Sequence, residues 1–195
     1  MRKMKLFGGL MVLCAIVALA LFTQGDISAA SLTSRIQVSL TGTLTDSTTL
    51  TDNQASLGVI RTTSLATGVG ASQADKIYTL KAQTIADGAT LSIDCKAALV
   101  DAFGAAFTPA KLRAVYIFST GANTTNLTLF GDANSVPILN TAATTSTLRP
   151  GGMFLATDVT TTGIAVTAGT GDIIKIVNAA GAAATVDVVL IGTSS

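Results

Sequence analysis

Short runs of alternating apolar and polar residues recur along most of the chain, with turn-forming residues between them. Apolar residues at positions 36, 38, 40 and 44 alternate with polar ones and predict a first strand. Further strands are expected at 76–85, 90–94, 112–119, 127–130, 153–156, 164–167, 173–177 and 186–191. The pattern predicts an all-β fold: a two-sheet antiparallel sandwich, jelly-roll-like, with eight to nine strands.

Three segments refine this picture. Residues 46–70 are rich in Thr, Ser, Asn and Gly and predict a long excursion with one weak strand at 57–62. Residues 97–103 (AALVDAF) predict the domain's one short helix, ended by Gly104. Four consecutive bulky apolar residues predict a central strand covered on both faces, with Tyr116 and Phe118 on one face and Val115 and Ile117 on the other.

The first 30 residues follow a different pattern. Three basic residues within positions 2–5 precede an almost uninterrupted apolar run at 6–22, and small residues follow at 28–30. This is the order of an export signal, with cleavage expected before Ala30 or Ser31. The alternative is a retained hydrophobic helix that anchors the chain in a membrane, although roughly 26 Å of helix is slightly short for a bilayer core of about 30 Å. In both cases the β-sandwich domain, residues 31–195, lies outside the cytoplasm, because basic flanks stay inside.

The side chains that carry most catalysis are missing. The chain has no His, Trp or Glu, which excludes Ser-His-Asp and Cys-His arrangements and removes the commonest zinc ligand. Asp94 and Asp101 are the nearest carboxylate pair, and their expected role is to cap the helix at 97–103. Asp132, Asp158 and Asp172 lie in or near turns at a spacing that matches no calcium motif. We therefore expect no enzyme activity, no cofactor, and no catalytic, cofactor-binding or metal-binding residue.

Charge narrows the range of partners. Three of the 12 basic residues and one of the 11 Asp residues lie in the first 30 positions, which leaves a nearly neutral domain without a basic stripe. Such a surface argues against direct binding of nucleic acid. Charged residues make up 12% of the chain, whereas designed soluble surfaces carry about 25–35%. The low charge predicts a surface covered by neighbouring molecules.

The cysteine and the aromatic residues of the domain give weaker indications of its function. Cys95 is the one cysteine after residue 30, and we expect a small buried apolar residue, with linkage between subunits as the alternative. The domain's aromatic residues are able to line a sugar-binding face, but the lack of Trp and the predominance of Phe favour core packing. They are Tyr78, Phe103, Phe107, Tyr116, Phe118, Phe130 and Phe154.

Four segments carry a resemblance to known proteins: KIYTL at 76–80, FTPAKLRAVYI at 107–117, RPGGMF at 149–154 and VVLIG at 188–192. Together they resemble the small β-sandwich, jelly-roll-like virion structural proteins of bacteriophages over residues 75–192. The resemblance implies a structural role and carries over no site residues. The apolar leader departs from it, because most capsid proteins assemble in the cytoplasm. A membrane-containing virion, or an exported bacterial filament or surface-layer subunit, reconciles the two.

These observations predict a non-enzymatic structural subunit of an extracytoplasmic or virion assembly, self-associating through β-sandwich surfaces. Its expected partners are copies of itself, and a membrane through residues 6–22. Its expected location is extracellular, at the cell surface, or in a membrane-associated virion. The alternative is a secreted or membrane-anchored binding module, with carbohydrate as the first candidate ligand. A dilute solution that contains only monomers under all conditions argues for this alternative.

Overall fold

The computed structural model of the protein describes residues 31–48, 51–139, 141, 143–179 and 181–195. The expected signal or anchor, residues 1–30, lies outside the described residues. Within them the chain forms twelve strands and no helix, which confirms the all-β prediction. None of the described residues forms a helix long and apolar enough to span a bilayer.

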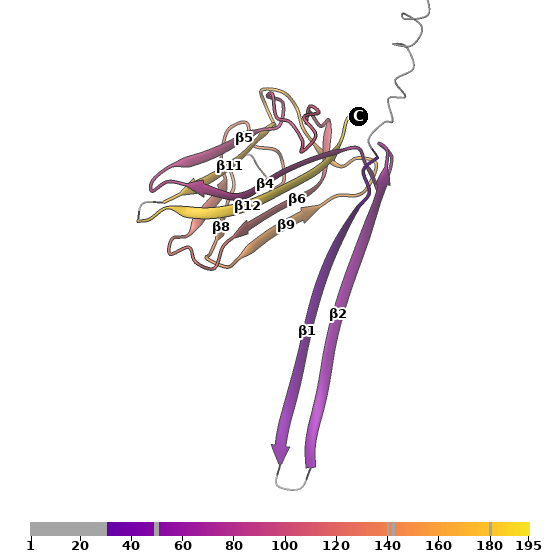
Figure 1. Ribbon diagram of the computed structural model, residues 1–195, viewed down its shortest axis with the longest axis vertical. Helices are drawn as coiled ribbons and strands as arrows, with labels where there is room; N and C mark the ends of the chain where they lie inside the picture. The colour runs from indigo at the N-terminus through magenta and orange to yellow at the C-terminus, as the bar shows by residue number, and fades with distance from the viewer. Residues whose placement is uncertain (1–30, 49–50, 140, 142, 180) are drawn as a thin grey trace, which may run out of the picture. The chain divides into compact units, whose positions relative to one another are not determined.

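Nine of these strands form two antiparallel sheets (Figure 1). The order in the first sheet is β4 (Lys76–Ile85), β12 (Ala184–Thr193), β6 (Lys111–Ser119) and β9 (Met153–Thr157), and β10 (Ile164–Ala165) also pairs with β6. The order in the second sheet is β5 (Thr90–Asp94), β11 (Ile173–Asn178), β7 (Leu127–Phe130) and β8 (Thr145–Leu148). β8 was not expected from the sequence, because its residues Thr-Ser-Thr-Leu carry a single apolar side chain.

The two sheets pack their apolar faces on each other, which makes the fold a β-sandwich. Ile117 and Val188 of the first sheet join Leu129 and Ile174 of the second in one core, and all four are inaccessible to solvent. Strand alternation explains this, because successive side chains point to opposite faces and every second residue enters the core. The two packed sheets are the part of the fold that the alternating sequence pattern predicts most directly.

Strand β6 is central, as expected from its four bulky apolar residues. It pairs with β12 along one side and with β9 along the other. Val115 and Ile117 point into the core, whereas Tyr116 and Phe118 lie on the opposite face and are half-buried. This confirms the predicted division of the four side chains between two faces. The face that carries Tyr116 and Phe118 is called the outer face below.

The expected excursion at 46–70 is wrong. β1 (Ser34–Thr48) and β2 (Thr51–Thr67) form one long antiparallel hairpin, called the arm below (Figure 1). Its register runs from Ser34 opposite Leu65 to Thr48 opposite Thr51. The short β3 (Gln73–Ala74) pairs in parallel with the end of β2. The Thr-rich composition suggested a loop, but Thr is β-branched and fits a pleated ladder. The weak strand expected at 57–62 lies within β2, and β2, β3 and β8 raise the strand count of the described residues to twelve, above the predicted eight to nine.

The expected helix at 97–103 is also wrong, since these residues form bends, a turn and an isolated β-bridge between Val100 and Ala106. The Oδ1 of Asp94 accepts hydrogen bonds from the amides of Lys96 and Ala97 at 2.8 and 3.1 Å. The Oδ1 of Asp101 accepts them from Phe103 and Ala105 at 2.8 and 2.9 Å. Asp side chains that bond nearby amides compete with helix formation, and a segment of seven residues is too short to resist this competition.

Buried polar groups hold the loops at one end of the sandwich. The fully buried Asn178 donates its side-chain amide to the carbonyls of Ile85, Ala86 and Ala182, and its Oδ1 accepts from the Thr125 hydroxyl. Asp87 and Gly88 form the turn that follows β4, with Gly88 at a φ of 66°. Glycine tolerates this left-handed conformation without strain.

Candidate functional site

The arm is amphipathic, because its register places most of its apolar side chains on one face. Residues directly opposite each other in a hairpin point to the same face. Leu40 lies opposite Val59, Leu44 opposite Ala55, and Gly42 opposite Leu57. Residues of the other face are mainly Thr, Ser and Gln, with Ile60 as the exception. The apolar face, called the arm stripe below, consists of Ile36, Val38, Leu40, Leu44, Ala55, Leu57, Val59 and Leu65.

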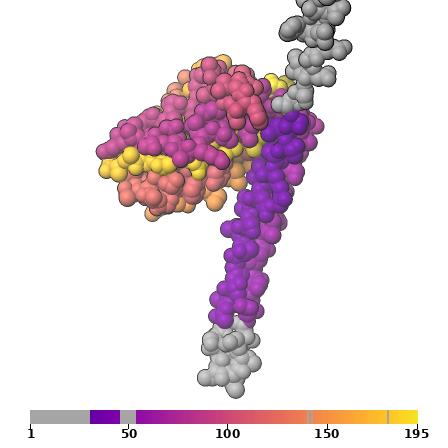
Figure 2. Space-filling view, in the orientation of Figure 1, coloured from indigo at the N-terminus to yellow at the C-terminus, as the bar shows by residue number. Residues whose placement is uncertain are grey.

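Most of the arm stripe is exposed to solvent. Leu40, Leu44 and Leu57 are 66%, 73% and 70% exposed. The described atoms of β1 and β2 lie at the surface in the space-filling view, where they are indigo to purple (Figure 2). Scattered apolar residues on a surface need no explanation, whereas large contiguous apolar patches are typical of interaction sites. An isolated two-stranded hairpin is also marginally stable in water, so the arm gains from a covering layer.

The base of the arm, in contrast, packs on the outer face of the first sheet. Leu65 is fully buried there together with Ala114 and Ile191, and Ile36 and Ile77 pack against this group. The apolar face of the arm therefore meets the apolar outer face of the sheet where the two elements join. This small second core lies on the opposite side of the sheet from the main core.

Arg113 fixes the loop that follows the arm. Its guanidinium is fully buried and donates to the carbonyl of Thr160 through Nη1, and through Nη2 to those of Val69 and Gly70 at 3.1 and 2.9 Å. Its Nε finds no partner among the described residues. The segment after the arm is held further by the Ser72 amide, which donates to the carbonyl of Val159 at 2.8 Å. A buried charge is stabilised by such charge-assisted hydrogen bonds.

Asp158 shapes the loop that supplies one of these carbonyls. Its Oδ1 accepts hydrogen bonds from the amide and the hydroxyl of Thr160 at 3.0 and 2.6 Å. These two bonds, and to a lesser extent the charge of Arg113, lower the pKa of the Asp158 carboxyl below its usual value.

The outer face of the first sheet continues beyond the base of the arm as an apolar surface. Tyr116 lies opposite Leu155 on β9 and opposite Val189 on β12, and Phe118 lies opposite Met153. Met153 is 63% exposed, whereas the other four are half-buried. These side chains are covered by no further layer of the described chain comparable to the second sheet on the other face.

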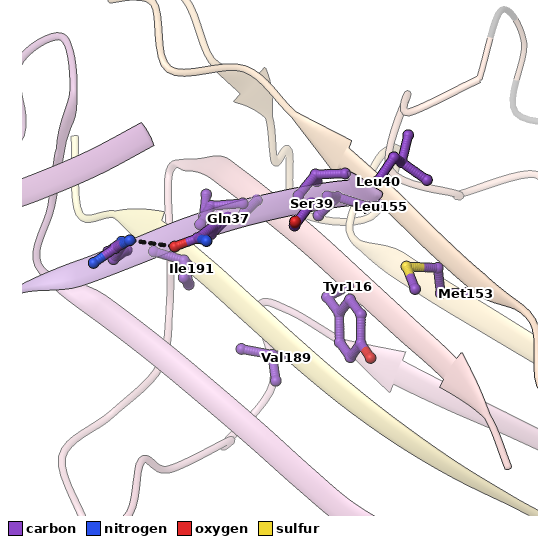
Figure 3. A pocket seen from close by; sticks show the side chains of 12 residues that line it. Gln37, Ser39, Leu40, Tyr116, Met153, Leu155, Val189 and Ile191 are labelled. Carbon is purple, nitrogen blue, oxygen red and sulfur yellow. Dashed lines mark hydrogen bonds between the residues drawn. The ribbon is translucent and has the colours of Figure 1, made fainter. Parts of the chain in front are cut away.

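A groove lies between the start of the arm and this outer face (Figure 3). Its volume is about 510 Å³, and β1 residues 35–40 form one wall. The other wall is formed by Ala114, Tyr116, Met153, Leu155, Val189 and Ile191, which come from β6, β9 and β12. Figure 3 shows Tyr116 as the aromatic ring of this wall, with Leu155 and Met153 beside Ser39 and Leu40. The sheet wall is mainly apolar, and every second residue of the β1 wall is apolar, so the groove suits an apolar occupant.

The acidic residues singled out from the sequence act as turn formers. Asp132 accepts a hydrogen bond from the Asn134 amide at 3.0 Å, and Asp172 accepts one from the Gly169 amide at 2.6 Å. The Nζ of Lys175 lies 3.7 Å from the Oδ2 of Asp132, and this is the one ion pair among the described residues. No group of three or more possible metal ligands comes together within the described part of the chain. Asp94 and Asp101 stabilise turns instead of capping a helix.

Cys95 is fully buried in the sandwich core and free, as expected for a small apolar residue. Burial, and to a lesser extent the charges of Asp94 and Asp172, raises the pKa of its thiol to about 12. A thiol in this state is a poor nucleophile. It is also inaccessible to another subunit, which contradicts the alternative of linkage between subunits.

Core packing is confirmed for Tyr78, Phe107, Phe130 and Phe154, whereas Tyr116 and Phe118 lie half-buried on the outer face. Phe107 is fully buried and its ring lies 5.5 Å from that of Tyr78, and the rings of Phe130 and Phe154 meet edge to face at 5.1 Å. Phe103 is 90% exposed, so core packing is wrong for this residue. It lies in the turn that replaces the expected helix.

Sequence reasoning missed the arm, although a signal for it is present. The apolar residues at 40 and 44 mirror those at 59 and 55 about the middle of the segment, as the register requires. Such mirror symmetry is the pattern of a hairpin in which one face is apolar on both strands. Comparison with known protein families, curated proteins and solved structures finds no match, so the chain is assigned to no family.

Proposed function

We propose that this protein is a non-enzymatic structural subunit of an extracytoplasmic or virion assembly, and that it associates with copies of itself. The observation that carries the proposal is the arm stripe, which exposes large aliphatic side chains along two paired strands. Burial of one Leu side chain contributes roughly 1.5–3 kcal/mol. Leu40, Leu44 and Leu57 together thus provide several kcal/mol for association that an isolated monomer leaves unused.

We also infer that the sandwich is a jelly roll. The supporting observation is its strand order: apart from the short edge strand β10, the body has eight strands, and consecutive strands β4 and β5 lie in different sheets. The first sheet contains the first, eighth, third and sixth of the eight, and the second contains the second, seventh, fourth and fifth. This interleaving is the double Greek key of a jelly roll, a fold found in viral capsid proteins. Fold alone does not establish function, so the arm stripe remains the principal support.

The alternative of a carbohydrate-binding module is less well supported. A sugar site needs aromatic platforms and several convergent hydrogen-bonding groups. The groove beside the arm has Tyr116 as its one aromatic residue, and aliphatic side chains make up most of its lining. This composition favours an apolar occupant over a polyhydroxylated one.

The proposal is tested with protein recovered after expression of the full chain. Intact mass gives the processing state: a start at Ala30 or Ser31 identifies a cleaved signal, and a mass that includes Met1 identifies an anchor. Sedimentation velocity over a wide concentration range and negative-stain electron microscopy then give the assembly state. We expect oligomers or ordered assemblies that grow with concentration. A protein that remains monomeric at every concentration would contradict the structural role.

A further inference from the structure

We propose that the arm stripe of one copy packs on the outer face of the first sheet of a second copy. The site on the second copy consists of Tyr116, Phe118, Met153, Leu155 and Val189. This inference rests on the proposed self-association and specifies its contact. The inference specifies both contacting surfaces. Association through other surfaces would therefore contradict the inference and leave the proposed self-association intact.

The first argument is that the chain already contains this contact in a shorter form. At the base of the arm, Leu65 and Ile36 of the stripe pack on Ala114 and Ile191 of the outer face. The neighbouring positions along the same strands, Tyr116 and Val189, lie next to these two on the same face, since they are two residues further on. The arm stripe and the apolar outer face of the sheet therefore both extend beyond the contact that they make with each other at the base of the arm.

The second argument is length, which prevents one copy from covering its own stripe. β1 has 15 residues, which at about 3.3 Å per residue gives an arm of roughly 50 Å. β6 has nine residues and is therefore about 30 Å long. Even an arm laid along its own sheet extends past the end of that sheet. Leu44 and Leu57, far from the base, therefore require another molecule.

The third argument is area. A two-stranded ribbon is about 10 Å wide, so an overlap of about 30 Å with the sheet gives roughly 300 Å² for each contacting face. Reciprocal exchange between two copies creates four such faces, or about 1,200 Å² in total, which is at the lower limit for stable interfaces. Contact in one direction gives half of this area. The area favours reciprocal exchange between two identical copies.

A bilayer is the main competing occupant for an apolar stripe, and Arg61 argues against it. Its register position opposite Val38 places it on the stripe face, between the base and Leu40. Its Nη1 donates to the carbonyl of Ile60, and it forms no ion pair among the described residues. Insertion of the stripe into hydrocarbon carries this guanidinium with it, at a large cost. A contact with a second protein through Leu40, Leu44 and Leu57, further from the base, leaves the guanidinium at the rim, in contact with water.

The test is cross-linking between two differently tagged full-length proteins, one with Leu44→Cys and the other with Met153→Cys, both carrying Cys14→Ser. The native Cys95 does not interfere, because it is fully buried. Each protein has one accessible cysteine on the described surface, so a mixed disulfide joins arm to sheet between copies. The matched control is Thr43→Cys, next to Leu44 on the polar face of the arm. We expect a mixed disulfide with Leu44→Cys at a yield at least about tenfold above that with Thr43→Cys.

A second measurement separates the possible failures. The triple variant Leu40→Ser, Leu44→Ser, Leu57→Ser is expected to weaken association at least about tenfold, whereas Phe103→Ser, which removes a still more exposed apolar side chain, has no effect. Association that persists in the triple variant, or disulfides that join only Leu44→Cys to Leu44→Cys, overturns the inference and leaves the proposed function intact. A wild-type monomer overturns both. Wild-type protein that starts at Ala30 or Ser31, and therefore lacks the apolar segment 6–22, assigns the stripe to a membrane if it remains monomeric and floats with phosphatidylcholine–phosphatidylglycerol vesicles, and this result also overturns both.

Discussion

The replacement Ile117→Ala tests whether β6 is the central strand of the fold. Ile117 is inaccessible to solvent and lies opposite Val188 on one neighbouring strand and Phe154 on the other, with all three facing the main core. Truncation removes buried carbon atoms from a position enclosed on both sides, and Ile→Ala changes at such positions cost about 2–5 kcal/mol. We expect a loss near the middle of this range, about 3 kcal/mol. For a domain of this size such a loss lowers Tm by about 6–12 °C.

The assay is urea unfolding followed by far-UV circular dichroism at concentrations where the protein is dissociated. The midpoint is expected to fall while the m-value stays unchanged, because the surface exposed on unfolding is nearly the same. Met153→Ala is the matched control, since it truncates an exposed residue on the other face and is expected to cost less than about 0.5 kcal/mol. If Ile117→Ala costs less than about 1 kcal/mol, or if the control costs as much, the assignment of inner and outer faces is wrong.

Four further predictions follow from the buried polar groups and the titratable side chains. Arg113→Met leaves three loop carbonyls without their donor, so we expect a loss of about 2–4 kcal/mol in urea unfolding and faster proteolysis after β2. Asn178→Ala removes four side-chain hydrogen bonds, and the same measurement is expected to show a loss of about 2–4 kcal/mol, whereas a loss below 1 kcal/mol contradicts the network. Cys95, with a thiol pKa of about 12, is expected not to react with Ellman's reagent at pH 8 until urea unfolds the protein. Rapid reaction in the native state contradicts its burial. Asp158 has a pKa lowered below 3.8, so its ionised form stabilises the fold above pH 3.8 and this contribution is lost as pH falls through the folded-state pKa. Asp158→Ala is therefore expected to be less stable than wild type at pH 7, with a difference that shrinks towards pH 2, and a difference independent of pH refutes this assignment.

Local and long-range hydrogen bonds of the polar side chains contribute differently to stability. Turn-forming bonds of Asp132 and Asp172 are local and satisfy nearby amides, whereas Arg113 and Asn178 connect segments that are far apart in the sequence. Local bonds form with little loop entropy, while long-range bonds depend on the sandwich having closed. The stability effects of the second group should therefore follow the cooperative unfolding of the whole domain.

Much of the sandwich could be predicted from the sequence alone. Strict alternation and strong turn dipeptides located β4, β5, β7 and β11 within a few residues, because the period of two in a half-buried strand appears directly in the residue order. The run at 115–118 also predicted a central strand whose side chains divide between two faces, although only the inner face is covered by a second sheet. The sequence lacks His and Glu and therefore predicted surface contacts in place of the common catalytic arrangements.

The arm, the missing helix and the candidate contact depended on tertiary structure. Residues 97–103 have helical propensity, but two Asp side chains and the closure of the loop at Phe107, whose amide donates to the Leu99 carbonyl, outweigh it. The Thr-rich arm lacks a strong local signal, and only the pairing of β1 with β2 gathers its scattered aliphatic residues into one stripe. A sequence pattern records which face of a single strand is apolar. Which strands lie side by side, and therefore which apolar faces remain uncovered, is decided only when the chain has folded.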